Sequence, residues 1–410
     1  MSSDNYTVSG TEPSTTSEKQ RLLALCGSME QLAGVRHIQY QDGRAAGLRG
    51  ALVWNGPLET MLMLDKCLDP AWLRYKGMNL GILTKPGLQG RNPYDTAGEE
   101  AVRSIMGGAM FTCGLGNIHG HRQVDGTEHP THGRIRTTPA EKIGMDAWFD
   151  GDSYRVRVTG EMREARLFGE NLVLRRTVEC IYGERPKQQP GQSSTSHKNS
   201  QAPRYPAMNA ISTARPICQL IFHDEIENQA FEPQPLCFLY HCNAGYPLLA
   251  PGTRLILPDR TCTPRDADAR QGMDTRNLMG EPQAGAPEQV FQHTMAADPQ
   301  GWTFGAFVND ALGLALAIRW NVNQIPLLTQ WKSSASGDYA MALEPANCGF
   351  GGRAQASRIL QPLETHVNEI QFCIYEGAQE IAALEAEERQ LRNPCPSQIP
   401  PILFRQKVIN

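Results

Sequence analysis

Residues 112–140 concentrate side chains that could bind a metal ion or a sugar. The stretch holds four histidines and three arginines: His119, His121, His129, His132, Arg122, Arg134 and Arg136. Residues two apart on a strand share a face, so His119 and His121 could ligate a metal ion. The same spacing lets His132 and Arg134 offer a neutral and a charged donor to sugar hydroxyls. A glycine-rich turn with exposed histidines has the same composition, and spacing alone leaves all three interpretations open.

His241 follows a strongly apolar run in the string LCFLYHCNAGYPLL. In a strand, His241 shares one face with Leu239 and Asn243. Gly245 and Pro247 then end the strand, so His241 and Asn243 are expected near the rim of a sheet, where ligand clefts open. A histidine in this position is also common as a hydrogen-bonded core residue.

Glu344 ends a second alternating run, DYAMALEPAN. In a strand it shares a face with Ala340 and Ala342, which leaves open space beside its carboxylate, and Pro345 then interrupts the strand. Burial in the wall of a cleft would raise the pKa of this carboxyl toward the range useful for a general base. The alternative is a surface glutamate at a turn.

Trp331 and Lys332 lie on the run that precedes Glu344. The indole could stack on the face of a sugar ring, and the ammonium group could bind a polar or anionic substituent. Trp331 is equally compatible with a place in the core.

The surrounding sequence has the pattern of β-strands. Asn55-Gly56, a strong hairpin signal, separates the apolar runs 47–55 and 58–65. Tyr154, Val156 and Val158 alternate with arginines, as in a strand with one buried face. Similar short runs recur between Gly/Pro turns, with one helix near each end. This pattern predicts an all-β fold, a large antiparallel sandwich or barrel.

The expected domain organisation is simple. Residues 1–16 are polar and are expected to form a disordered tail, followed by a single domain over 17–393. Within it, 184–216 is rich in Pro, Gln, Ser and Lys and is expected to be a disordered insertion between strands. Residues 394–410 form a C-terminal extension.

Helices are expected at both ends of the domain. Ser17 and Gln20 match a capping box, and leucines at helical spacing continue until Gly34, which would end the helix. The C-terminal helix should cover 377–392. The polar, Gly/Pro-rich segment 259–287 is expected to be a loop bordering a cleft.

Composition narrows the partners. A net charge of −4 provides no basic field for nucleic acid, and the longest apolar runs are too short to span a membrane. The 11 cysteines show no paired spacing and mostly lie in apolar runs, which favours a reducing compartment. The polar N-terminus does not have the pattern of a signal peptide. We therefore expect a cytoplasmic protein, and no particular oligomeric state is indicated.

Five strings together resemble one known family. They are YKGMNLGILTKPG (75–87), GGAMFTCGLGN (107–117), HPTHGRIRTTPAE (129–141), DEIENQAFEPQPLCFLYHCNAGYPLL (224–249) and QWKSSASGDYAMALEPAN (330–347). Their order and spacing resemble an uncharacterised branch of the aldose 1-epimerase-like proteins in the galactose mutarotase superfamily. The resemblance runs from about Gly47 to Ile374, and it implies a large antiparallel β-supersandwich with a sugar site in a concave cleft.

The resemblance also implies roles for individual residues. By its place in the motif, His241 would be the acid that protonates the ring oxygen, and Glu344 the base at the anomeric hydroxyl. His132 resembles the histidine that binds sugar hydroxyls, and Arg134 matches a family arginine only loosely. The expected substrate-binding set is completed by Asn243, Trp331 and Lys332.

The sequence departs from the family in three places. Tyr240 replaces the usual asparagine before the acid, and the string after His241 differs from the usual one. Gly107-Gly108 is closer to the hexose-phosphate epimerases, and the 184–216 insertion has no counterpart that we associate with the family. These differences bear on the identity of the sugar.

The predicted reaction is the interconversion of sugar anomers by acid–base catalysis, which requires no cofactor and no metal. Its partner would be a small sugar or sugar derivative. Two alternatives belong to other classes. One is a metal-dependent sugar isomerase, epimerase or lyase that uses His119, His121 and His132. The other is a sugar-binding protein without catalytic activity.

Overall fold

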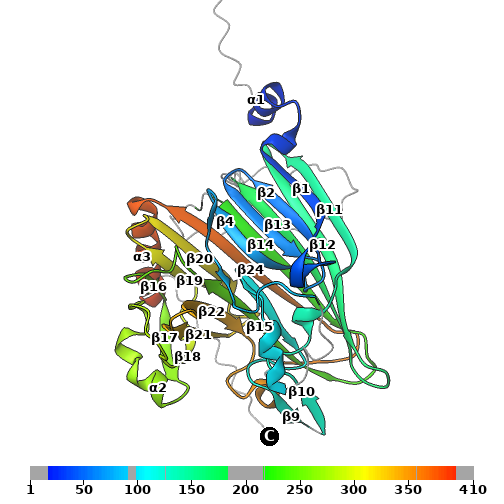
Figure 1. Cartoon of the computed structure of the whole chain (residues 1–410), viewed down its shortest axis with the longest axis vertical. Helices are drawn as coiled ribbons and strands as arrows, with labels where there is room; N and C mark the ends of the chain where they lie inside the picture. The colour runs from blue at the N-terminus through cyan, green and yellow to red at the C-terminus, as the bar shows by residue number, and fades with distance from the viewer. Residues whose placement is uncertain are drawn as a thin grey trace, which may run out of the picture.

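The computed structural model describes residues 17–90, 98–124, 126–182, 216, 218–356 and 358–393. The predicted tail (1–16), nearly all of the predicted insertion (184–216) and the C-terminal extension (394–410) lie outside these residues. The described chain is built mainly of antiparallel strands in two large sheets and three small ones (Figure 1). This confirms the predicted all-β sandwich.

The larger sheet has eight strands. Its order is β11 (Glu141–Asp150), β12 (Ser153–Ala165), β13 (Asn171–Tyr182), β14 (Cys218–Asn228), β24 (Thr365–Glu376), β20 (Leu314–Asn321), β19 (Trp302–Asn309) and β16 (Arg254–Ile256). The alternation predicted at 154–158 is present, because Val156 and Val158 are buried while the arginines between them are half-buried.

The second large sheet has seven strands and carries both candidate catalytic residues. Its order is β17 (Asp259–Pro264), β18 (Gln289–Met295), β21 (Leu327–Ser333), β22 (Ala340–Ala346), β15 (Gln234–Ala244) and β23 (Arg358–Leu360), and β8 (Met110–Leu115) also pairs with β15. Side chains from the two large sheets share one hydrophobic core, which includes Leu343 and Met341 from this sheet and Phe222 and Phe372 from the larger one.

Smaller sheets extend this sandwich. A five-stranded sheet contains β1 (Ala33–Gln39), β2 (Arg49–Asn55), β3 (Leu58–Met63), β4 (Asp69–Tyr75) and β5 (Met78–Asn79). Two ribbons pair β6 (Ile82–Leu83) with β7 (Gly107–Gly108), and β9 (Arg122–Val124) with β10 (Thr127–His129). The hairpin predicted at Asn55-Gly56 joins β2 to β3, and Gly56 has the positive φ of 58° that the turn requires.

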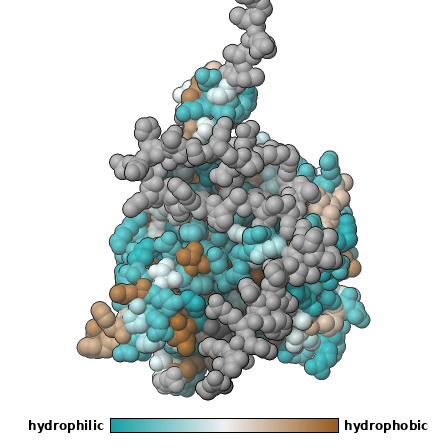
Figure 2. Space-filling view, turned by 180° about the vertical axis from the view of Figure 1, so that it is seen from behind, coloured by the Kyte–Doolittle hydropathy of each residue, from teal (hydrophilic) through white to brown (hydrophobic). Residues whose placement is uncertain are grey.

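The helices lie at the edges. They are α1 (Glu18–Leu25), α2 (Ala267–Gln271) and α3 (Ala378–Arg392), with short 3₁₀ helices η1 (Met29–Gln31), η2 (Gly43–Ala45), η3 (Gly98–Ser104), η4 (Ile135–Thr137), η5 (Met273–Thr275) and η6 (Gly352–Gln355). None of the helices in the described ranges is long and apolar enough to cross a membrane. On the face shown in Figure 2, the surface that is not grey is mostly hydrophilic, with scattered apolar patches.

Two predicted boundaries were wrong. The N-terminal helix has the predicted capping box at Ser17, but it ends at Leu25, and Gly34 lies in β1. Gly34 is needed there for space, because a Cβ would come within 2.7 Å of the Trp54 ring. The segment 259–287, predicted as a loop, begins with β17 and contains α2.

Candidate active site

The pairing of β15 with β22 brings the two candidate catalytic residues together. Asn243 on β15 pairs with Ala342 on β22. Two residues along each antiparallel strand, His241 lies opposite Glu344, on the face of the seven-stranded sheet that points away from the shared core. The distance from His241 Nε2 to Glu344 Oε1 is 3.2 Å. Both side chains are largely buried, with 10% and 3% of their surface exposed.

Asn243 fixes the proton on the other side of the imidazole. Its amide nitrogen donates to the carbonyl oxygens of His241 (3.0 Å) and Gly108 (3.3 Å), so its Oδ1 must face the ring. Oδ1 lies 2.8 Å from His241 Nδ1, which therefore carries a hydrogen and donates it. The other ring nitrogen, Nε2, therefore faces Glu344. It does so with a lone pair when the ring is neutral and with a second N–H when the ring is protonated.

Burial determines which partner holds the proton between His241 and Glu344. Burial lowers the pKa of His241 to about 3, and the hydrogen bond to Asn243 opposes this only in part. Burial raises the pKa of Glu344, and the negative charge of Glu288 raises it further. A buried pair of this kind favours its neutral form, in which the carboxyl is protonated and donates to the imidazole.

Aromatic rings surround His241. Phe111 on β8 pairs with His241 across the sheet, and the two rings are stacked with centroids 4.3 Å apart. His132 lies edge-on to His241 at 5.6 Å, and Trp331 on β21 at 5.9 Å. Burial lowers the pKa of His132, with a further contribution from His241, so this ring is neutral near pH 7. Such a set of flat apolar faces and neutral imidazoles suits contacts with the C–H faces and hydroxyls of a sugar.

His132 comes to lie beside His241 through a tight turn and not along a strand. Its φ is 60°, its N–H donates to the carbonyl of His119, and its carbonyl accepts from Gly114 N–H. Gly133 must be glycine, because a Cβ there would lie 2.1 Å from the Gly114 oxygen. This geometry corrects the prediction that His132 and Arg134 share one strand face. Arg134 directly precedes η4, and its guanidinium donates to the carbonyl of Glu128.

Lys332 also lies outside the cleft. It follows Trp331 on β21 and therefore points to the opposite face of the sheet, where its ammonium donates to the carbonyls of Thr275 (2.8 Å) and Leu278 (2.9 Å). Burial lowers its pKa. The predicted role of Lys332 in substrate binding is corrected accordingly.

The structure adds residues that spacing did not indicate. Glu288 accepts hydrogen bonds from Trp331 Nε1 (2.7 Å) and from Arg265 (2.8 Å). Arg265 influences the pKa of both His119 and Glu344, which places its charge near both. Arg265 lies in the 259–287 segment, and Glu288 directly follows this segment, just before β18. The expectation that this segment borders the site was the nearest signal in the sequence.

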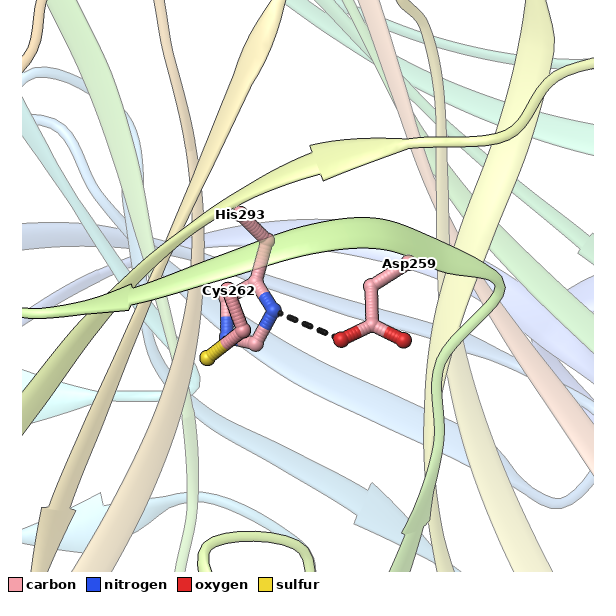
Figure 3. A group of neighbouring side chains, drawn as sticks. All are labelled: Asp259, Cys262 and His293. Atoms are coloured by element: carbon pink, nitrogen blue, oxygen red, sulfur yellow. Dashed lines mark hydrogen bonds and ion pairs between the residues drawn. The ribbon is translucent and has the colours of Figure 1, made fainter. Parts of the chain in front are cut away.

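The alternative in which His119 and His121 ligate a metal ion does not match their positions. Both lie in a loop, where His119 is half-buried with φ 61°, and His121 is exposed and bonded to Glu99. Among the residues described, the only group of three or more possible ligands with donor atoms within 4.8 Å of one another is Asp259, Cys262 and His293 (Figure 3).

The Asp259, Cys262 and His293 cluster has the contacts of a structural network. Asp259 bonds His293 Nδ1 at 3.1 Å and Arg392 at 2.5 Å, and the second ring nitrogen of His293 contacts Gln330 at 3.1 Å. His293 pairs with Leu328, so it lies on the face opposite Glu344. The guanidinium group beside Asp259 makes this carboxylate a poor ligand for a second cation.

The arrangement of two face-packed antiparallel sheets is that of the galactose mutarotase-like proteins. A protein from Klebsiella pneumoniae subsp. pneumoniae that is provisionally named an aldose 1-epimerase matches with a TM-score of 0.73 and 20% identity over 88% of each chain. A galactose mutarotase-like protein from Clostridium acetobutylicum matches with a TM-score of 0.53 and 12% identity over 84% of this chain and 99% of that one. At these low sequence identities, the structural similarity shows the fold alone.

The sequence assigns the family. Residues 45–187 and 207–372 match the family described as "Domain of unknown function (DUF4432)", and the chain belongs to this family. No curated protein is similar enough to this chain to count as a match.

Proposed function

We propose that this protein is a carbohydrate isomerase that interconverts the anomers of a sugar, with His241 and Glu344 as its acid–base pair. The single observation that carries the proposal is the 3.2 Å contact between His241 Nε2 and Glu344 Oε1 on a buried sheet face. The two sugar oxygens that exchange protons in this reaction are bonded to the same carbon. An acid and a base that act on them must therefore lie close together, as these two groups do.

The proton count of the pair matches the reaction. With His241 protonated and Glu344 ionised, the imidazolium gives a proton to the ring oxygen while the carboxylate takes the proton of the anomeric hydroxyl. The bond between the anomeric carbon and the ring oxygen breaks, and an open-chain aldehyde forms. The pair now holds its one proton on Glu344, which is the form that burial favours in the free protein.

Ring closure reverses these transfers. After the aldehyde rotates, the ring hydroxyl attacks its other face, His241 takes the hydroxyl proton, and Glu344 returns its proton to the aldehyde oxygen. No atom or electron is lost, and the reaction consumes no other reagent. We propose that His132, Trp331 and the Phe111 ring contact the sugar, and that Asn243 positions His241.

The experiment is an NMR measurement of anomer exchange over a panel of free, phosphorylated and oxidised sugars. Glu344→Gln and His241→Ala should each lower the accelerated rate by at least about 10²-fold, the lower end of the usual contribution of one acid–base group. Glu179→Gln replaces a buried glutamate of the eight-stranded sheet and should leave the rate unchanged. Normal exchange in Glu344→Gln or His241→Ala would refute the assignment, and binding without exchange in the natural chain would indicate a sugar-binding protein.

The cysteines bear on where the protein works. Ten cysteines in the described ranges are free thiols, most of them buried. We propose a cytoplasmic role in carbohydrate metabolism, where a reducing environment maintains such thiols.

A further inference from the structure

A second cavity of about 250 Å³ lies away from the catalytic cleft. It is bordered by the β9–β10 ribbon, the end of β12, the turn from β12 to β13, and η6. None of the described cleft residues His132, His241, Trp331 or Glu344 lines it. The cavity is therefore a separate site with its own side chains.

Two buried polar groups line this second cavity. Glu164 accepts a hydrogen bond from Leu115 N–H at 2.8 Å, and burial raises the pKa of its carboxyl. His129 is 7% exposed, and within the described part of the chain its Nδ1 is buried without a hydrogen-bond partner. Burial lowers the pKa of His129 to about 4, so this ring is neutral near pH 7. An unsatisfied buried ring nitrogen of this kind costs free energy.

Gly116 packs closely against both of these groups. A Cβ at this position would lie 3.0 Å from Glu164 Oε1 and 3.4 Å from His129 Nδ1. Any side chain other than hydrogen would thus enter the cavity between its carboxyl and its imidazole. The backbone of Gly116 does not have a positive φ, so spatial room is what the glycine provides here.

The remaining polar lining balances its charges. Arg166 pairs with Glu170 at 3.3 Å, and the guanidinium of Arg353 donates to the Gly116 carbonyl at 3.2 Å. With Glu164, the lining holds two guanidinium and two carboxyl groups, so its formal charge favours neither an anion nor a cation. Hydroxyl groups both donate and accept, and they are the ligand groups that such a mixed lining satisfies best.

We propose that this cavity is a second binding site for a sugar, which takes one neutral monosaccharide. Its volume lies just below the range of about 300–1,000 Å³ typical of sites for drug-sized ligands, which limits the ligand to a single ring. Val124 and Leu172 supply apolar surface for the C–H face of that ring. The inference does not depend on any reaction at Glu344.

The test is a methyl NMR titration of the full chain carrying Glu344→Gln, with labelled Leu and Val and with D-galactose, D-glucose and D-mannose as separate probes. The Val124 and Leu172 methyls report the second cavity, and Leu239, which lies on the His241 face, reports the cleft. At least one sugar should shift Val124 and Leu172 in a saturable manner. Shifts confined to Leu239, or no shifts, would overturn the proposal while leaving the proposed function to its own test.

Two pairs of variants locate the binding. Thr127→Trp fills the cavity from its rim, whereas Gln123→Trp places the same side chain on an exposed position of the same ribbon. Gly116→Ala narrows the space between Glu164 and His129, whereas Gly120→Ala adds a methyl with nothing within 4 Å. Thr127→Trp should weaken the sugar-induced shifts of Leu172 by at least about tenfold in affinity, or 1.4 kcal/mol. Unchanged affinity in Thr127→Trp and Gly116→Ala would overturn the proposal.

Discussion

At the scale of single residues, the site depends on one shared proton. The hydrogen-bond directions of Asn243 leave room for a single hydrogen between His241 Nε2 and Glu344 Oε1. The pair is therefore one titrating unit, with macroscopic pKa values that belong to both groups. The pH dependence of this pair follows from the two pKa shifts that burial causes.

The rate of anomer exchange should fall as pH rises through the raised pKa of Glu344, wherever that basic limb lies, and only an acid limb reports on His241. Above that pH the pair has lost its shared proton, so nothing can protonate the ring oxygen. On the acid side, His241 gains a second proton only near pH 3, where no base remains. NMR exchange rates, corrected for the spontaneous reaction, should thus show a basic limb and no acid limb near pH 6.5. A limb at 6.5, the value for an ordinary histidine, would contradict the assignment.

Asn243 is a positioning residue that acts through His241. Asn243→Leu removes the acceptor for Nδ1–H, so we expect the proton to redistribute between the two ring nitrogens and kcat to fall by about 10-fold or more. Nitrogen NMR of the labelled imidazole would detect the change of tautomer. A purely structural role would reduce stability and leave both the tautomer and the pH profile of the folded fraction unchanged.

At the scale of elements, β22 places small side chains beside Glu344. Ala342 and Ala346 share its face, and Ala342 pairs with both Asn243 on β15 and Trp331 on β21. Small residues in these positions keep the sheet surface low where a sugar would lie. The small side chains on β22 therefore belong to the proposed site together with its polar and aromatic residues.

Ala342→Leu should place a larger side chain beside Glu344. We expect KM to rise by at least about tenfold, with a cost in stability of about 1–3 kcal/mol from overpacking. Met341→Leu is the matched control, because Met341 is buried on the opposite face and a change of similar volume costs less than about 1.5 kcal/mol. Steady-state kinetics and thermal unfolding of both variants provide the measurement, and equal KM values would show that Ala342 does not border the sugar.

The sequence predicted which residues share a face of one strand, and it missed contacts that depend on pairing between distant strands. Alternation along one strand placed His241 with Asn243, and Glu344 with Ala342, because a strand has a fixed period of two. Phe111 joins them only through the pairing of β8 with β15, which no local pattern indicates. The error at Arg134 has a local cause, since the positive φ of His132 ends the alternation there.

At the scale of the whole molecule, α3 packs against one part of the outer face of the eight-stranded sheet, at its β24, β20, β19 and β16 strands (Figure 1). Its apolar side packs Ile381, Leu384 and Leu391 against β19, β20 and β24. Beyond this cluster, Arg392 at its end bonds the carbonyl of Leu257 and the carboxylate of Asp259. The helix thus links the edges of both large sheets, at a distance from the catalytic face.

The buried ion pair on α3 should contribute to stability and not to catalysis. Arg319 on β20 donates two hydrogen bonds to Glu387, at 2.7 and 2.8 Å, with both side chains almost fully buried. Glu387→Ala leaves that guanidinium without its carboxylate partner, and we expect a loss of about 3–5 kcal/mol in the free energy of unfolding. The expected loss is large because water cannot solvate the buried Arg319 guanidinium in place of Glu387.

Glu385 is the matched control on the same helix. It pairs with Arg254 at 2.7 Å, but both side chains are about a third exposed, so Glu385→Ala should cost less than about 1 kcal/mol. Denaturant unfolding of the two variants measures the difference, and anomer exchange in the folded fraction at low temperature should equal that of the natural chain in both. Only the Arg319–Glu387 pair is shielded from water, so its loss should cost more. Equal losses of stability in the two variants would contradict this prediction.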